Sequence, residues 1–296
     1  MYVSPDDARS DLLLAGAVFV FGPVLLRLLL QIIPFDRIPG VSQILPIVVP
    51  ALVTIAVPLA LVRYRGEAWS SLGFGSSKDG LGRGALLALP IVVASVIAAV
   101  VGGLSPRGAL PATMVTQPGL LLPLLSRLVI WVGLAVLAAY VTTKARDAFR
   151  MDFSTIPEGM TRIARVLAMV VGVAALIRFV PALDFPLGLP IDISSLALPL
   201  GVAATVYLVW RGVQGPSSTG FAVLLTPTVL LAVGSFILSF QPALLIDSVW
   251  TGAMIAGLGL AMGALRESRG SAWPLIGMAL VIALATTMPV PLRIGF

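Results

Sequence analysis

The chain contains no histidine and no cysteine among its 296 residues, and only 11% of its residues are charged. Without imidazole or thiolate side chains it lacks the usual ligands of zinc, haem and iron–sulfur centres, and it can form neither a Ser–His catalytic pair nor a disulfide bond. No long apolar stretch carries an aspartate or a glutamate near its centre. We therefore expect a protein that is not an enzyme, with no metal and no cofactor.

Apolar residues make up 58% of the chain, and its mean hydropathy is +1.06. No water-soluble domain hides so much apolar surface, and a helix needs about 20 apolar residues to cross a bilayer core. Because backbone polar groups in lipid must pair within their own segment, each stretch should be a helix. The sequence predicts an all-α, polytopic integral membrane helix bundle, a single transmembrane domain over residues 1–296. Its nine predicted transmembrane helices are 12–33, 44–62, 84–104, 119–141, 160–180, 193–210, 221–240, 244–265 and 272–290.

Basic residues indicate which way these helices run. Lysines and arginines concentrate in every second loop, whereas the other loops hold only Arg37, Arg107, Arg178 and Arg293. Because cytoplasmic loops retain basic residues, this alternation predicts a plasma-membrane protein with its N-terminus in the cytoplasm and its C-terminus outside. The basic residues are spread over loop ends, where they face membrane lipids and not a nucleic acid.

A recurring string indicates an internal duplication. Residues 65–74 and residues 211–221 both contain Arg-Gly followed by Ser-Ser-x-Gly-Phe. The sequence therefore predicts parallel repeat halves, 1–150 and 151–270, with a ninth helix in 271–296. The alternative is that Arg-Gly and Gly-Phe pairs recur wherever apolar helices meet the cytoplasmic interface.

Two arginines lie inside predicted transmembrane helices, Arg27 in the first and Arg127 in the fourth. An unpaired ionisable side chain at membrane depth is costly, so each arginine is a candidate for function. Arg27 is close enough to its helix end to reach the lipid headgroups. Arg127 is the better candidate for binding an anion or for pairing with a buried acid.

Aspartates near the predicted outer surface are the candidate partners of Arg127. Asp247 lies in the first turn of the eighth predicted helix, and Asp184 and Asp192 flank the sixth. We expect Arg127, Asp247 and Asp192 to bind a small anionic ligand. The alternative is that the aspartates simply suit the positive end of a helix dipole. A cluster of the three aspartates would instead indicate a lipid-modifying enzyme.

Small residues line one face of the eighth predicted helix, where Gly252, Ala256, Gly259 and Gly263 are spaced three or four residues apart. Small side chains let helix backbones approach closely. This spacing therefore predicts helix packing, either within the bundle or in a homodimer.

Residues 61–74, Leu-Val-Arg-Tyr-Arg-Gly-Glu-Ala-Trp-Ser-Ser-Leu-Gly-Phe, precede Leu81-Gly-Arg-Gly-Ala85 at the start of an apolar helix. Together they resemble the early part of the CPBP family of CAAX-protease and bacteriocin-processing membrane proteins. The resemblance implies a metallopeptidase signature, a Glu-Glu pair followed by Arg, with histidines later in the chain. Thr142 and Thr143 stand where that pair is expected. The resemblance therefore implies a relative without the peptidase chemistry.

The composition favours a non-enzymatic, permease-like or partner- and ligand-binding membrane protein. Its 29 glycines and 23 prolines suit close packing and broken helices, which transporters use. Expected partners are membrane lipids and either a small anionic ligand or another membrane protein. The alternative is a catalytically degenerate CPBP relative that acts as a scaffold or peptide binder, in which Thr142 and Thr143 face a cavity.

Overall fold

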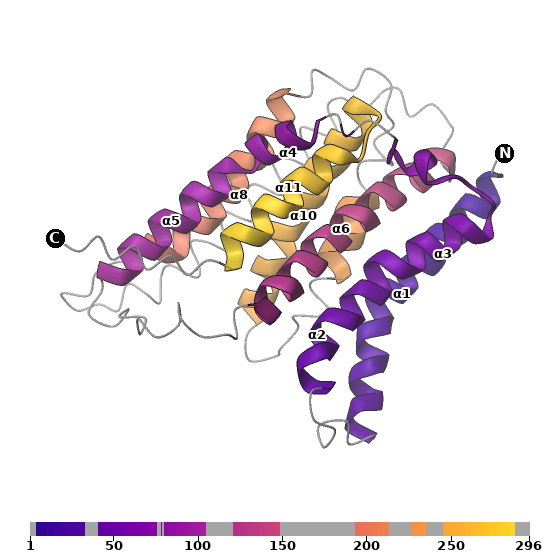
Figure 1. The fold of residues 1–296 in the computed structure, drawn as a ribbon, viewed down its shortest axis with the longest axis horizontal. Coiled ribbons are helices and arrows are strands. Elements are labelled where there is room, and N and C mark those ends of the chain that lie inside the picture. Colours follow the sequence, from indigo (N-terminus) through magenta and orange to yellow (C-terminus); the bar gives the residue numbers. More distant parts are fainter. Residues whose placement is uncertain are drawn as a thin grey trace.

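The computed structural model describes residues 4–32, 41–75, 78, 80–104, 121–148, 193–212, 226–234 and 245–287. Regular structure in this part of the chain is helical throughout, without a strand, which confirms the all-α prediction there (Figure 1). The predicted helix 160–180 lies outside the described residues. Most of the predicted second repeat half is also outside them, so the duplication stays a prediction.

The described helices follow the predicted apolar stretches but differ from them in length and continuity. In chain order they are α1 (Pro5–Ile32), α2 (Val41–Ala51), the π-helix η2 (Leu52–Ala56), α3 (Val57–Tyr64), the 3₁₀-helix η3 (Trp69–Leu72), α4 (Leu81–Leu87), α5 (Leu89–Leu104), α6 (Leu121–Ala148), α8 (Ile193–Gly212), α10 (Leu245–Arg269) and α11 (Trp273–Thr287). Residues 226–234 are helical as well.

Three of these helices are long and apolar enough to cross a membrane, over Pro5–Leu25, Ile47–Tyr64 and Leu124–Ala148. Shorter apolar helices cover Leu81–Ile97, Leu200–Val209 and Trp273–Ala285. The chain thus has helices that can span a bilayer, as its composition predicts.

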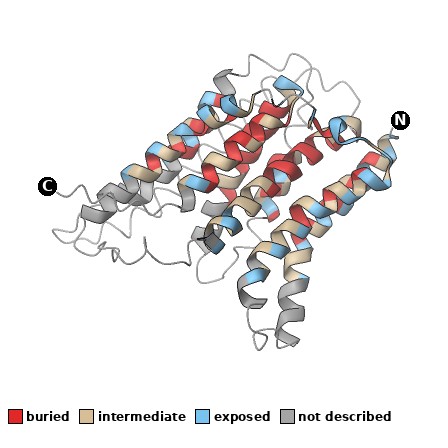
Figure 2. Ribbon diagram, viewed as in Figure 1, coloured by how far each residue is buried: buried red, intermediate tan, exposed pale blue. Residues whose placement is uncertain are grey.

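The helices lie side by side in a slanted row, with α6 near its middle (Figure 1). On one side α6 packs against α1 and α2, and on the other it packs against α10 and α11. Beyond these, α11 contacts α4 and α5, and α5 packs closely on α8. Buried residues are concentrated in α6, α10 and α11, whereas the outer helices carry most of the exposed ones (Figure 2).

Many exposed side chains on the outer helices are large and apolar, which is unfavourable in water but suits contact with lipid tails. They include Leu13, Leu14, Phe21 and Leu25 on α1, Leu86 on α4, Leu89, Val93 and Ile97 on α5, and Leu200, Tyr207 and Leu208 on α8.

The first helix begins at Pro5, seven residues before the predicted start at residue 12. Ser4 caps it, because the Ser4 hydroxyl accepts a hydrogen bond from the Asp7 N–H at 3.1 Å. Proline is favoured in the first turn, and acidic residues there complement the helix dipole. The apolar run alone therefore misplaced the start, and the polar turn belongs to the helix.

Two predicted transmembrane helices are interrupted. The second changes from α to π geometry at Leu52–Ala56, where the Thr54 hydroxyl donates a hydrogen bond to the Pro50 carbonyl at 2.6 Å. The third breaks between α4 and α5, since Pro90 lacks an N–H and its ring displaces the carbonyl four residues earlier. Both interruptions lie within segments that the sequence predicts to be continuous.

Candidate functional site

Five charged side chains meet at the end of the bundle where α1 begins and α3 and α6 end. We call them the ion-pair cluster: Asp7, Asp11, Arg65, Glu67 and Lys144. Two come from α1, two from the turn after α3 and one from α6. Each ion pair in the cluster joins two of these elements, so the cluster links parts of the chain that are far apart in sequence.

Lys144 is the most deeply buried member, with a fully buried side chain on α6. Its ammonium group contacts Glu67 Oε1 and lies 3.3 Å from Asp11 Oδ2. These two carboxylates are themselves only 7% and 3% exposed. The Lys144 Nζ also lies 5.8 Å from the centre of the Tyr140 ring, one helical turn earlier. A charge removed from water this completely requires paired countercharges, which the two carboxylates supply.

Arg65 connects this buried pair to the surface. Its Nη2 lies 2.9 Å from Asp11 Oδ1, and its Nη1 lies 2.9 Å from Asp7 Oδ1. Nη2 also donates to the Ser10 hydroxyl at 3.1 Å. The hydrogen bond to Asp11 raises the pKa of Arg65. Since Asp7 is half-exposed and Lys144 fully buried, the cluster runs continuously from the surface into the bundle.

The local sequence explains how these side chains converge. Asp7 and Asp11 are four residues apart and so lie on one face of α1. Gly66, with a φ of 68°, ends α3 in the left-handed conformation, and the Glu67 N–H then bonds back to the Val62 carbonyl at 3.0 Å. This turn holds Glu67 beside the end of α6.

Arg266 of α10 adds a further cation behind the cluster. Its Nη2 lies 3.3 Å from the Ser71 carbonyl and 3.3 Å from the Thr143 hydroxyl. Gly73 leaves room for it, because a Cβ there would come within 2.8 Å of the Arg266 Cζ. Burial lowers the pKa of the Arg266 guanidinium. Within the described part of the chain, Arg266 Nε and the Tyr140 hydroxyl are buried without a hydrogen-bond partner.

Thr142 and Thr143, which stand where the CPBP resemblance expects a Glu-Glu pair, lie beside this region. Thr142 is fully buried, and its hydroxyl donates to the Ala138 carbonyl at 2.7 Å. The Thr143 hydroxyl donates to the Ala139 carbonyl at 2.8 Å and accepts from Arg266. Both threonines are therefore satisfied within α6 or by α10.

The predicted anion-binding residues lie elsewhere. Arg127 is exposed on α6, about 25 Å from Lys144 along the helix axis at 1.5 Å per residue. Asp247 is in the first turn of α10, but its side chain is outside the described residues, as is that of Arg27. Asp184 and Asp192 also lie outside them. The pairing of Arg127 with Asp247 and Asp192 therefore stays a prediction.

The four small residues of α10, Gly252, Ala256, Gly259 and Gly263, are all buried. At Gly259 a Cβ would come within 3.1 Å of the Pro227 carbonyl oxygen and of Leu231 Cδ1. The glycine thus lets α10 approach the helix 226–234 closely, which is a contact within the bundle.

The ion-pair cluster was not predicted from the sequence, because Arg65 and Lys144 were expected in loops that face lipid headgroups. The structure instead extends α6 to Ala148 and buries Lys144 inside the bundle. One signal was available in the sequence: Asp7 and Asp11 share a helix face once Ser4 is recognised as a cap. Glu67, which follows a turn glycine, carried no such signal, since only the fold brings it to Lys144.

Within the described residues, no group of three or more His, Cys, Asp or Glu side chains is placed to hold a metal ion. What the cluster can do chemically is exchange ion pairs between elements, since three carboxylates share two cations.

No protein-family model, no curated protein and no solved structure matches the chain.

Proposed function

We propose that this protein is a non-enzymatic, permease-like membrane protein in which the ion-pair cluster is a gate at the cytoplasmic end of the helix bundle. The observation that carries the proposal is the fully buried Lys144, whose two carboxylate partners belong to two other elements. Separation of α1 or of the turn after α3 from α6 requires these pairs to break. A gate needs contacts that stabilise its closed state and that can be replaced by other contacts in its open state.

A purely stabilising role accounts less well for the same geometry. Burying two opposite charges costs desolvation energy that their attraction only repays with good geometry, so apolar residues often stabilise a core equally well. Buried ion pairs are better suited to specifying one arrangement among alternatives. The unpartnered Arg266 Nε and Tyr140 hydroxyl beside the cluster support a second arrangement, in which these groups find partners.

The interrupted second helix supports movement of the gate. Its π-helical turn, Leu52–Ala56, lies between α2 and the α3 segment that leads to Arg65 and Glu67. Such π turns are frequent at functional sites, where a helix changes direction. Thr54 packs against α6 at Gly133, where a Cβ would overlap the threonine hydroxyl. Rotation about this turn would move α3, and with it two members of the cluster, relative to α6.

The topology that accompanies the proposal has nine transmembrane helices, a cytoplasmic N-terminus and an outside C-terminus in the plasma membrane. The cluster lies at the end of α1 that this topology places in the cytoplasm. The proposed ligand-binding residues near the outer surface are Arg127, Asp247 and Asp192. The Arg127 guanidinium binds a small anion, and the two aspartates pair with Arg127 when the anion is absent. The gate and this site would then lie toward opposite ends of α6, so that the gate controls access to the site from the cytoplasm.

Spin-label distance measurements in liposomes test the gate. The chain has no cysteine, so Arg9→Cys on α1 and Ser70→Cys in η3 give a unique label pair at two exposed positions. Lys144→Met removes the cation that Asp11 and Glu67 share and leaves Glu67 without an ion-pair partner among the described residues, so we expect a longer distance to gain population. Glu67→Gln, a milder change, should shift the distribution in the same direction.

Arg63→Met is the matched control, because Arg63 is an exposed cation on α3 outside the cluster. It should leave the distance distribution unchanged. An identical single distance in the parent, Lys144→Met and Glu67→Gln proteins contradicts the gate.

That outcome would favour a second function, a catalytically degenerate CPBP relative that acts as a static scaffold or peptide binder. One observation supports this alternative: the segment that carries the resemblance places Glu67 against Lys144, directly after Thr142 and Thr143 on α6. The turn after α3, which belongs to the segment that resembles the CPBP family, thus contacts the part of α6 where the resemblance places the family's catalytic pair.

A further inference from the structure

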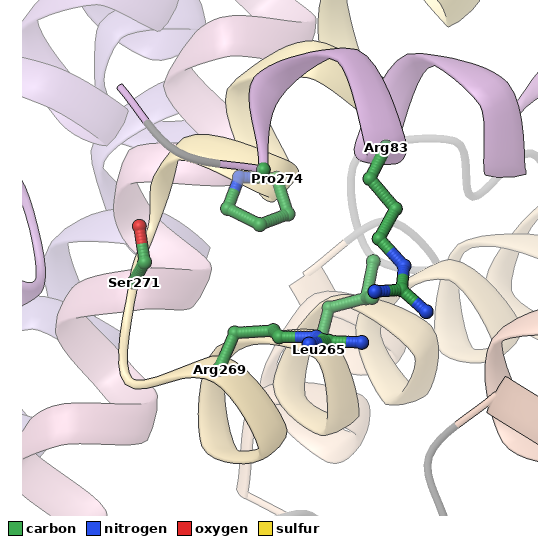
Figure 3. Close-up of a pocket in the computed structure, with 6 residues that line it drawn as sticks. Arg83, Leu265, Arg269, Ser271 and Pro274 are labelled. Carbon is green, nitrogen blue, oxygen red and sulfur yellow. The ribbon is translucent and has the colours of Figure 1, made fainter. Parts of the chain in front are cut away.

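A pocket of about 350 Å³ lies at the same end of the bundle, separate from the ion-pair cluster (Figure 3). It is formed between the start of α4, the end of α10 and the start of α11. Its lining residues are Gly80, Arg83, Leu265, Arg269, Ser271 and Pro274.

The frame of this pocket is held by close backbone contacts. Gly80 precedes α4 with a φ of 90°, and a Cβ there would come within 2.8 Å of Pro274 Cγ. Gly270 turns the chain between α10 and α11 with a φ of 62°. These left-handed turns, one before α4 and one after α10, bring Arg83 and Arg269 to the same pocket.

The polar side chains of the pocket are those of Arg83, Arg269 and Ser271. All three can donate hydrogen bonds, and none carries a negative charge. Both guanidinium groups extend to the same side of the pocket, over Leu265, and both arginines are exposed (Figure 3). Among the described residues, no carboxylate lines the pocket and none forms an ion pair with Arg83 or Arg269. The Ser271 oxygen accepts a hydrogen bond from the Trp273 N–H at 3.3 Å, which leaves its proton to donate.

We propose that this pocket binds a phosphate group. Two arginine forks on the same side of the pocket match the oxygens of a phosphate, and bidentate pairing of arginine with phosphate is a strong, charge-assisted contact. Leu265 and Pro274 give the pocket an apolar floor, which suits the glycerol and first methylenes of a phospholipid. A bound phosphate also relieves the repulsion between the two guanidinium groups. The site does not depend on the gate.

Thermal unfolding in detergent tests this proposal and distinguishes a lipid phosphate from a soluble one. The reference state is the protein in an alkyl maltoside detergent, whose headgroup carries no phosphate. In one arm phosphatidylglycerol is added to this reference, and in the other inorganic phosphate is added. We expect ligand-dependent stabilisation of the parent protein in at least one arm. Arg83→Gln/Arg269→Gln should weaken the apparent affinity in that arm about tenfold or more, since two charge-assisted contacts to the phosphate are lost.

The control is Arg9→Gln/Arg63→Gln, which removes the same charge from two exposed arginines outside the pocket. Stabilisation only by phosphatidylglycerol identifies a lipid headgroup, and stabilisation by inorganic phosphate identifies a soluble ligand. Equal losses in the pocket and control variants would reduce the effect to general surface charge and overturn the site, as would the absence of stabilisation in both arms. Single variants Arg83→Gln and Arg269→Gln replace the double variant if it does not fold.

Discussion

At the scale of single residues, Lys144 is a charged side chain that this chain, with few charged residues, buries among countercharges. Its fully buried ammonium group is held by Glu67 and Asp11, and Asp11 is held in turn by Arg65. Lys144, Glu67 and Asp11 therefore each have a partner whose removal leaves a buried charge. This dependence makes the cluster sensitive to single substitutions in a way that an exposed pair, such as Arg9 with Asp6, is not.

Lys144→Met should lower the free energy of unfolding by about 3–5 kcal/mol, because it strands Asp11 and Glu67 without their shared cation. Reversible unfolding in detergent, followed by circular dichroism, measures the change. Adding Glu67→Gln to Lys144→Met should recover part of the loss, since one of the stranded charges is then removed. Equal stability of Lys144→Met and the exposed-cation control Arg63→Met would contradict the tight pairing of Lys144.

At the scale of helices, α4 and α11 pack with almost no side chain between them. A Cβ on Gly84 of α4 would overlap the Pro274 carbonyl, and a Cβ on Gly277 of α11 would overlap the Leu81 carbonyl. Reciprocal glycines therefore set the distance between these two helices. Gly82, two residues before Gly84 on the same short helix, has nothing within 4 Å of such a Cβ.

Gly84→Ala should destabilise the protein by about 1–3 kcal/mol, because α4 must move away from the α11 backbone. Gly82→Ala is its matched control and should be neutral or stabilising by up to about 1 kcal/mol, since alanine favours a helix and meets no neighbour. Thermal melts of the two variants in the same detergent give the comparison. Equal melting temperatures for the Gly84→Ala and Gly82→Ala proteins would contradict the close approach of α4 and α11.

Apolar length and composition predicted the all-α class and the approximate position of every described α-helix, but not the 3₁₀-helix η3, because hydrophobicity reports only on segments that can enter lipid. Continuity was predicted less well: the π turn at Leu52–Ala56 and the break before Pro90 depend on local backbone pairing, which an apolar run does not reveal. The ion-pair cluster was missed altogether. Lys144 and Glu67 become partners only through the packing of α6 against the turn after α3, which a single sequence does not encode locally.

At the scale of the whole molecule, charge and apolar surface are arranged along one axis. The ion-pair cluster, Arg266 and the Arg83–Arg269 pocket all lie at one end, where α1, α4 and α11 begin and α3, α6 and α10 end. Exposed apolar side chains cover the flanks of the outer helices. This arrangement is the one expected if the basic residues of every second loop lie on one side of a membrane, as the proposed topology has them.

The proposed nine-helix topology predicts which positions an impermeant thiol reagent reaches on intact cells that express the protein. Because the parent chain has no cysteine, each single-cysteine variant reports on one position. Arg107→Cys and Arg293→Cys should be labelled from outside, whereas Ser70→Cys and Ser217→Cys should be labelled only after the membrane is permeabilised.

These four positions separate an error in orientation from an error in helix count. Reversal of all four results means that the chain is inverted, which would place the ion-pair cluster and the phosphate pocket outside and remove the cytoplasmic gate. Reversal of Ser217 and Arg293 alone means that an odd number of helices was miscounted between residues 107 and 217, with α1 and the turn after α3 still at the cytoplasmic side. Reversal of Arg293 alone means that the last stretches cross the membrane a different number of times. Since α1 and the turn after α3 fix the side on which the gate lies, the first of these outcomes contradicts its cytoplasmic placement and the other two leave it intact.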